Sequence, residues 1–128
     1  MRALLDTHAF LWFNSNDPRM SGGALALIED GENEIVLSAV SALEIAIKYA
    51  RGRLPEVTDP DSYVPSRMAR YGLGSLAISI PHALRAGVLP PIHRDPFDRL
   101  LVAQAQLEGL PILTSDANIA RYDIQVIW

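Results

Sequence analysis

Short apolar runs alternate along this chain with longer segments of helical periodicity, and this alternation limits the fold more than any other feature. The runs that we expect to form strands lie at residues 2–5, 35–37, 76–80, 111–113 and 124–127. The segments that we expect to form helices lie at residues 9–13, 21–29, 41–50, 61–71, 82–88 and 96–107. Strands alternating with helices are typical of parallel βαβ units. We therefore predict an α/β fold, a three-layer α/β/α sandwich on a mainly parallel sheet.

The size and composition favour one folded unit. The chain has 128 residues, of which 49% are hydrophobic, and this is enough for one core. We expect a single domain over residues 1–128. The formal net charge of −4 argues against a protein that coats nucleic acid through an excess of basic residues. It does not exclude a nucleic-acid enzyme, because acids gathered in one pocket and neutralised by metal leave the remaining surface near neutral.

The cellular compartment can be predicted from what the sequence lacks. There is no cysteine, which excludes disulfides, thiolate zinc sites and cysteine nucleophiles and fits a reducing compartment. The first apolar run is interrupted by Asp6, so it cannot form the core of a signal peptide. No apolar run is long enough to cross a bilayer. We expect a cytoplasmic protein without membrane contact.

Two acidic residues follow strands of the predicted sheet. Asp6 comes directly after the first strand, and Asp116 comes shortly after residues 111–113. The carboxyl ends of parallel strands share one edge of the sheet, where ligands bind, so these distant residues can meet there. Each also has a purely structural interpretation, because an aspartate at a helix start caps the exposed amides.

Two more acids lie on predicted helices. Glu44 forms the pattern Ser41-x-x-Glu44, typical of a capping box, and stands four residues before Lys48, so alone it would be judged structural. Asp98 is different, because its helical neighbours include the apolar stripe of Leu101, Val102 and Ala105. An unpaired carboxylate beside such a stripe is costly. We predict that Asp98 is functional.

Asp95 lies one helical turn before Asp98 and is followed by Pro96, which is typical of an N-cap. We therefore assign Asp95 a supporting role beside Asp98. Four acids brought to one place would repel one another by about 1 to 4 kcal/mol per close pair, so the cluster needs a cation. Oxygen ligands favour a hard ion, Mg²⁺ or Mn²⁺, and the chemistry that fits such a site is phosphodiester hydrolysis.

Other kinds of site are less well supported. His8, His82 and His93 show no spacing typical of metal ligands. No glycine-rich phosphate loop and no nucleophile elbow is present. The basic residues Lys48, Arg51 and Arg53 gather at the end of the helix that carries Glu44, where they form either a solvated face or a phosphate-contacting patch.

The acidic signatures and their surroundings resemble the PIN domain, and more narrowly the VapC-type ribonuclease toxins of prokaryotic toxin–antitoxin pairs. The resemblance covers nearly the whole chain and is carried by Leu4-Leu5-Asp6-Thr7-His8, residues 37–48, residues 93–105 and Ile112-Leu113-Thr114-Ser115-Asp116. It implies a metal-dependent endoribonuclease using Mg²⁺ or Mn²⁺, with Asp6, Glu44, Asp98 and Asp116 as catalytic and metal-binding residues. Thr7 and Thr114 match accessory hydroxyl positions, and Arg99 joins the basic RNA-binding candidates. The implied partners are RNA, a VapB-type antitoxin and a second copy of the chain in a homodimer.

Two alternatives remain open. The first is a catalytically silent PIN-like module that binds protein or RNA through the same fold. The second is a phosphatase that forms an aspartyl phosphate on Asp6, but this chemistry requires a second aspartate two residues later, and His8 occupies that position. The dominant third acid is either Asp98 or Asp95.

Overall fold

The computed structural model describes all 128 residues and contains one sheet of five strands. Every pair of neighbouring strands is parallel, and the order across the sheet is β3-β2-β1-β4-β5. The first strand of the chain therefore lies at the centre. The strands are β1 (Arg2–Leu5), β2 (Glu34–Ser38), β3 (Gly74–Leu76), β4 (Ile112–Leu113) and β5 (Val126–Ile127).

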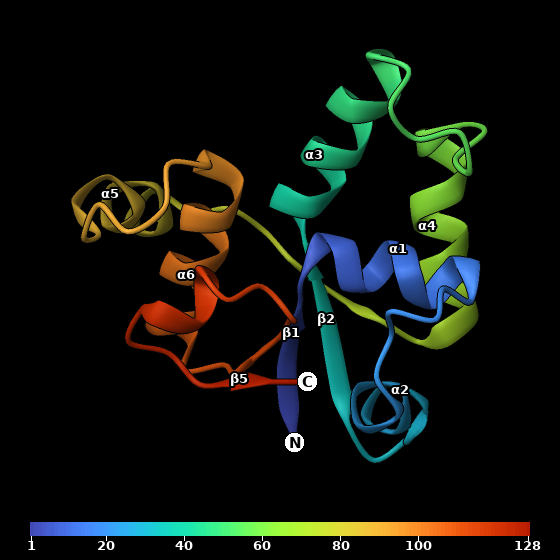
Figure 1. Ribbon diagram of the computed structural model, residues 1–128, viewed down its shortest axis with the longest axis horizontal. Helices are drawn as coiled ribbons and strands as arrows, with labels where there is room; N and C mark the ends of the chain where they lie inside the picture. The colour runs from blue at the N-terminus through green and yellow to red at the C-terminus, as the bar shows by residue number, and fades with distance from the viewer.

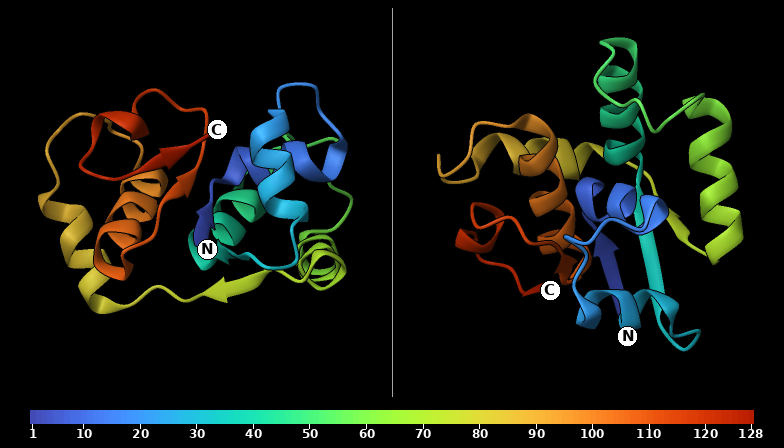
Figure 2. Two further views of the ribbon diagram at one scale, coloured as in Figure 1. Left: turned by 90° about the horizontal axis from the view of Figure 1, so that it is seen from below. Right: turned by 45° about the vertical axis from the view of Figure 1, so that its right-hand side comes forward.

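Helices cover both faces of this sheet, as Figures 1 and 2 show. Helices α1, α2 and α4 lie on one side and α5 and α6 on the other, while α3 extends from the end of β2 and contacts both α4 and α6. The prediction of a three-layer α/β/α sandwich is confirmed. The helices are α1 (Thr7–Ser15), α2 (Gly22–Glu29), α3 (Ala39–Ala50), α4 (Pro60–Tyr71), α5 (Ile80–Val88) and α6 (Pro96–Glu108), followed by the short 3-10 helix η1 (Ile119–Arg121).

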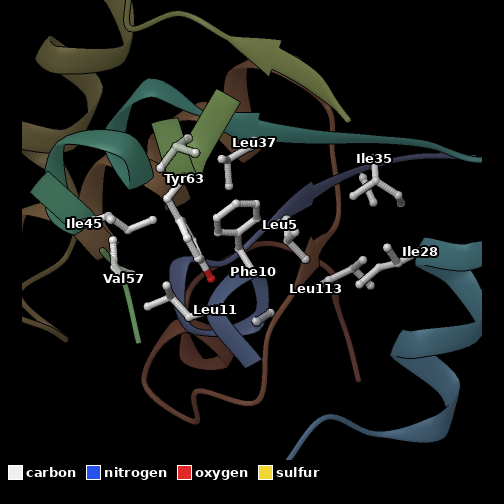
Figure 3. Close-up of a cluster of buried hydrophobic side chains, with 13 residues drawn as sticks. Leu5, Phe10, Leu11, Ile28, Ile35, Leu37, Ile45, Val57, Tyr63 and Leu113 are labelled. Carbon is white, nitrogen blue, oxygen red and sulfur yellow. The ribbon is translucent and has the colours of Figure 1, made fainter. Parts of the chain in front are cut away.

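The alternation of side chains along the strands produces two cores. Leu5 is in register with Leu37 and Leu113, and all three point into the core shared with α1, α2 and α4 (Figure 3). Leu4 and its neighbours on the adjacent strands point to the opposite face, where α6 packs. Because the central parallel strands β1, β2 and β4 are covered on both faces, they bury nearly all of their side chains and read as apolar runs. Each buried leucine contributes roughly 1.5 to 3 kcal/mol.

The order of the strands creates a crevice at the centre of the sheet. From β1 the chain moves outward to β2 and β3, and it later returns to the other side of β1 to form β4 and β5. The connections that leave β1 and β4 therefore run in opposite directions. In open α/β sheets such a topological switch point is where ligands bind, just beyond the carboxyl ends of the strands. Asp6 follows β1 and Thr114 follows β4, so the switch point places them together.

Two predicted element boundaries are wrong. Residues 76–80 were expected to be a strand, but β3 ends at Leu76 and α5 begins at Ile80. Ser79 is the N-cap of α5 and forms a capping box with His82. The helix expected from Ser41 begins at Ala39 instead, because the Ser38 hydroxyl accepts the backbone N–H of Val40. The other predicted strands and helices are found within a few residues of their expected positions, and α4 continues through Pro65.

None of the helices combines the length and apolar character that a membrane span needs.

Candidate functional site

Asp6 lies at the carboxyl end of β1, in the N-cap position of α1. Its side chain makes no capping hydrogen bond, so the structural interpretation of this residue is not supported. The side chain is 3% exposed. Oδ2 accepts a hydrogen bond of 2.9 Å from the Thr114 hydroxyl, whereas Oδ1 is buried and has no partner. Burial raises the pKa of Asp6 against the opposing influence of the Thr114 hydrogen bond and the nearby His8.

Glu44 lies in the middle of α3 and is 2% exposed. Oε2 pairs with Nζ of Lys48 at 2.7 Å, whereas Oε1 is buried and has no partner. The predicted capping box of Ser41 and Glu44 is wrong, because both residues lie inside the helix. Ser41 is buried and accepts a hydrogen bond of 2.8 Å from the Thr7 hydroxyl. This hydrogen bond joins α3 to the first turn of α1, next to Asp6.

Asp98 and Asp95 divide the roles at the start of α6. Asp95 is the N-cap, as predicted, and accepts the backbone N–H of Phe97 at 2.8 Å and of Asp98 at 3.4 Å. Asp98 is 8% exposed. Burial, and then the negative charges of Asp95, Asp6, Glu44 and Asp116, raise the pKa of Asp98 to about 7. The charges that act on Asp98 come from residues far apart in the sequence, so the structure brings the predicted acids close to one another.

Asp116 and His93 complete the cluster. Ligand atoms of His93, Asp98 and Asp116 lie within 4.8 Å of one another, a spacing that suits a shared cation. Oδ1 of Asp116 also accepts the backbone N–H groups of Asn118 and Ile119, so its capping role before η1 is real and leaves Oδ2 for a ligand.

His93 was missed at the sequence level, because its spacing was compared only with that of other histidines. Its Nε2 lies 2.8 Å from Oδ2 of Asp98. The signal that would have found it is its position five residues before a buried acid, across the N-cap of the same helix. Two residues connect His93 to the start of α6, and the chain turns there so that His93 lies against the first turn of that helix.

The basic candidates occupy different environments. Lys48 is engaged with Glu44, at the margin of the acidic cluster. Arg51 and Arg53 are exposed at the carboxyl end of α3, where a phosphate can reach them. Arg99 donates hydrogen bonds to backbone carbonyls of Ala86, Leu89 and Pro90. Its guanidinium therefore holds the segment between α5 and α6, the segment that carries His93.

The donor set fits a hard divalent cation. Asp6 and Glu44 each use one carboxylate oxygen for a fixed partner and bury the other without one. A buried carboxylate oxygen without a partner is unfavourable, and a bound cation would offset this cost. Carboxylate oxygens with one imidazole nitrogen suit Mg²⁺ or Mn²⁺, and no thiolate is present to favour a softer ion.

Comparisons with known proteins agree with this architecture. The model of the PIN domain family matches residues 3–125, a range that contains all four predicted acids. Ribonuclease VapC16 of Mycobacterium tuberculosis is 44% identical over 69 residues, which are 51% of this chain and 49% of that protein. The chain thus spans about half the length of this curated relative.

Solved structures share the whole fold at low sequence identity. VapBC2 of Rickettsia felis, solved with a DNA fragment from its promoter, superposes with a TM-score of 0.72 at 17% identity and covers 100% of this chain and 99% of its own. VapBC-1 of nontypeable Haemophilus influenzae gives a TM-score of 0.63 at 16% identity, with 99% and 97% of the two chains covered. The family match over nearly all of the sequence, with the strand order and acidic crevice described above, places this chain in the PIN domain family.

Proposed function

We propose that this protein is an endoribonuclease that requires Mg²⁺ or Mn²⁺ and acts as the toxin of a VapBC-type toxin–antitoxin pair. The partial match to a ribonuclease named VapC and the fold shared with VapBC proteins support the assignment. We further propose a VapB-type antitoxin and a second copy of the chain as protein partners. The lack of cysteine supports a cytoplasmic location.

The observation that carries this proposal is the pair of orphaned oxygens in the crevice. Oδ1 of Asp6 and Oε1 of Glu44 come from different elements and are both buried without a partner. An ordinary buried ion pair would satisfy both oxygens of each carboxylate. A site that leaves one oxygen of each acid unmatched is prepared for a ligand of positive charge.

Each residue of the crevice then has a separate task. Asp6, Asp98 and Asp116 would hold the cation, with Glu44 and His93 completing the site. When bound, the ion supplies positive charge that activates water and stabilises the charge developing on the phosphate. Thr114 orients Asp6 through Oδ2, and Lys48 orients Glu44 through Oε2.

Asp98 is the acid whose ionisation depends most on a cation. Its carboxylate is buried on the apolar flank of α6 and its pKa is raised to about 7 by burial and by the neighbouring acids, so a bound divalent cation would hold it in the ionised form that binds metal. The adjacent His93 nitrogen fixes the orientation of Oδ2 at 2.8 Å. Arg51 and Arg53 would contact phosphates of the RNA from the end of α3. Together these groups would place a phosphodiester against the acids.

The test is cleavage of a mixed RNA pool by purified protein free of antitoxin, with Mg²⁺ or Mn²⁺ and then with EDTA. We expect cleavage that needs the metal and that is lost in Asp6→Asn and Asp98→Asn. Asp30→Asn is the matched control, because Asp30 is an exposed acid near the opposite ends of the strands. Failure of the folded protein to cut any RNA would favour the catalytically silent binding module instead.

A further inference from the structure

The largest cleft of the molecule lies outside the acidic crevice. It encloses about 520 Å³ between α1, the loop that follows α1 and the connection from α3 to α4. In Figure 1 the carboxyl end of α1 points away from the sheet toward α4, and the loop follows from there. The side chains that matter here are His8, Trp12, Asn16, Asp17, Arg19 and Glu56. The volume is within the range of roughly 300 to 1,000 Å³ typical of small-ligand sites.

Arg19 is held in this cleft as a flat, exposed cation. Its guanidinium lies 4.5 Å above the ring of Trp12. Two hydrogen bonds, from Nε at 3.0 Å and from Nη2 at 2.8 Å, fix it to the two oxygens of Asp17. The Arg19 side chain nevertheless remains 65% exposed. A guanidinium that is fixed in one plane and open on its outer face is a preformed surface on which an aromatic ring can stack.

The cleft adjoins the acidic crevice through His8. His8 is exposed on the first turn of α1, two residues after Asp6. On the other side its ring lies 5.9 Å from that of Trp12, one turn further along the helix. A chain whose phosphate reaches the acids can therefore extend along α1 into the cleft.

The charges that line the cleft favour a nucleobase as its ligand and disfavour a phosphate group. Asp17 and Glu56 are acidic and Arg19 is the one arginine or lysine among the residues that line the cleft, so the formal charge that a phosphate would meet there is negative when histidine is counted as neutral. The single cation is already matched by Asp17. A neutral ring with amino groups suits this setting, because it stacks on the guanidinium and donates to nearby carboxylate or amide oxygens. Asn16, the C-cap residue of α1, which has a left-handed backbone conformation, offers such an amide at the edge of the cleft.

We propose that the cleft between Trp12, Arg19 and Glu56 receives one nucleobase of a single-stranded RNA, stacked on the Arg19 guanidinium beside the acidic crevice. This inference rests on the proposed ribonuclease function, which it deepens by naming where the substrate is read. Stacking would hold the strand next to the acids and give the nuclease a preference for unpaired regions.

The test measures binding in EDTA, where metal-dependent cleavage cannot occur. Trp12 and Trp128 are the only two tryptophans and are in contact, with ring centroids 5.8 Å apart. A Trp128→Phe background leaves Trp12 as the sole tryptophan, and the quenching of its fluorescence, excited selectively over tyrosine, is titrated with short oligoadenylate. An abasic oligomer of the same length carries equal charge and serves as the ligand control. The variants are Arg19→Ala, Arg19→Lys and, as a control, Arg2→Ala, which removes an exposed arginine at the start of β1.

We expect oligoadenylate to bind at least about tenfold more tightly than the abasic oligomer, as one stacked base would give. Arg19→Ala and Arg19→Lys should both abolish this preference, because lysine keeps the charge but not the plane. Arg2→Ala should keep it. Equal binding of the two oligomers by the parent would overturn the proposal, and so would a full preference in Arg19→Lys. RNA cleavage by a protein without the preference refutes the subsite alone, whereas the preference without cleavage refutes the nuclease and supports the subsite.

Discussion

The Thr114 hydroxyl donates a hydrogen bond of 2.9 Å to Oδ2 of Asp6, between residues 108 positions apart in the sequence. The bond crosses the switch point from β4 to β1. It also assigns different tasks to the two oxygens of Asp6, because Oδ2 is fixed and Oδ1 is left without a partner. The orientation of the first acid is therefore set by the last segment of the site.

Thr114→Val should weaken both the fold and metal binding. Valine keeps the shape but leaves Oδ2 of Asp6 buried without a donor, which costs about 1 to 3 kcal/mol of unfolding free energy. The affinity for Mn²⁺ should fall, since the carboxylate is no longer held. Urea denaturation and calorimetric titration measure the two effects. Thr114→Ser restores the donor and should recover most of both, and a valine variant with unchanged Mn²⁺ affinity would contradict the role of this hydroxyl.

Asp98→Asn should stabilise the protein in the absence of metal. The carboxylate is buried and faces four negative charges, so its neutral isostere removes an unfavourable interaction. We expect a gain of about 1 to 3 kcal/mol at pH 8 in EDTA and a loss of the stabilisation that Mn²⁺ gives to the parent. Thermal melts with and without Mn²⁺ measure both. A destabilised variant would mean that the charge of Asp98 supports the metal-free fold.

The stability of the metal-free protein should fall as the pH rises from about 4 to 7. The folded pKa of Asp98 is near 7, whereas its ordinary value is 3.8. Between these two values the folded chain keeps the proton on Asp98 while the unfolded chain has lost it, so each rise in pH favours the unfolded chain until the folded carboxyl also ionises. At about 1.4 kcal/mol per pKa unit, the loss is at most about 4 kcal/mol. Asp6 shifts in the same direction and adds to this loss.

Urea denaturation in EDTA at several pH values tests this slope. Asp98→Asn should flatten it, because the titrating group is gone. Asp17, whose pKa is lowered to about 2 by Arg19, stays ionised throughout the window and cannot produce the effect. A slope that is equally steep in Asp98→Asn would show that other groups dominate.

Lys48→Met should destabilise the protein through Glu44. The ion pair is 2.7 Å long, and the Glu44 side chain is almost fully buried while that of Lys48 is partly exposed. Removing the lysine leaves a buried carboxylate with no partner, at a cost of about 1 to 3 kcal/mol because the lysine end of the pair is partly exposed. Glu44→Gln in the same chain should recover most of this loss. Denaturation of the four proteins of the double-mutant cycle measures the coupling, and strictly additive effects would contradict it. Arg51→Met, an exposed change near the end of the same helix, should shift stability by less than about 0.5 kcal/mol.

The centre of the sheet could be predicted, because β1, β2 and β4 are buried on both faces and read as apolar runs. The placement of Asp6 and Asp116 follows from the same logic, since strand ends are visible in the sequence and parallel strands share an edge. Each of these acids can thus be recognised from its local sequence, and the parallel topology of the sheet explains why they lie near one another.

The errors concern choices between neighbouring polar residues. Ser38 and Ser41 can both cap a helix, and the choice depends on the pairing of β2, which ends at Ser38. The apolar run that ends at Ile80 favours a strand there, although Ser79 and Pro81 are typical of an N-cap followed by the first turn of a helix. His93 could not be found from its spacing to other histidines, because its partner is Asp98 and their contact depends on a loop that Arg99 holds from within the fold.

The order of the strands also sets the time at which the site can exist during synthesis. A ribosome-bound chain that has emerged only as far as α6 already carries Asp6, Glu44 and Asp98, but it lacks the strand that pairs with β1 on the far side of the crevice. The three acids then have neither Thr114 nor Asp116 beside them. The crevice is therefore assembled only after β4 has left the ribosome, because the pairing of β4 with β1 brings its last side chains to Asp6.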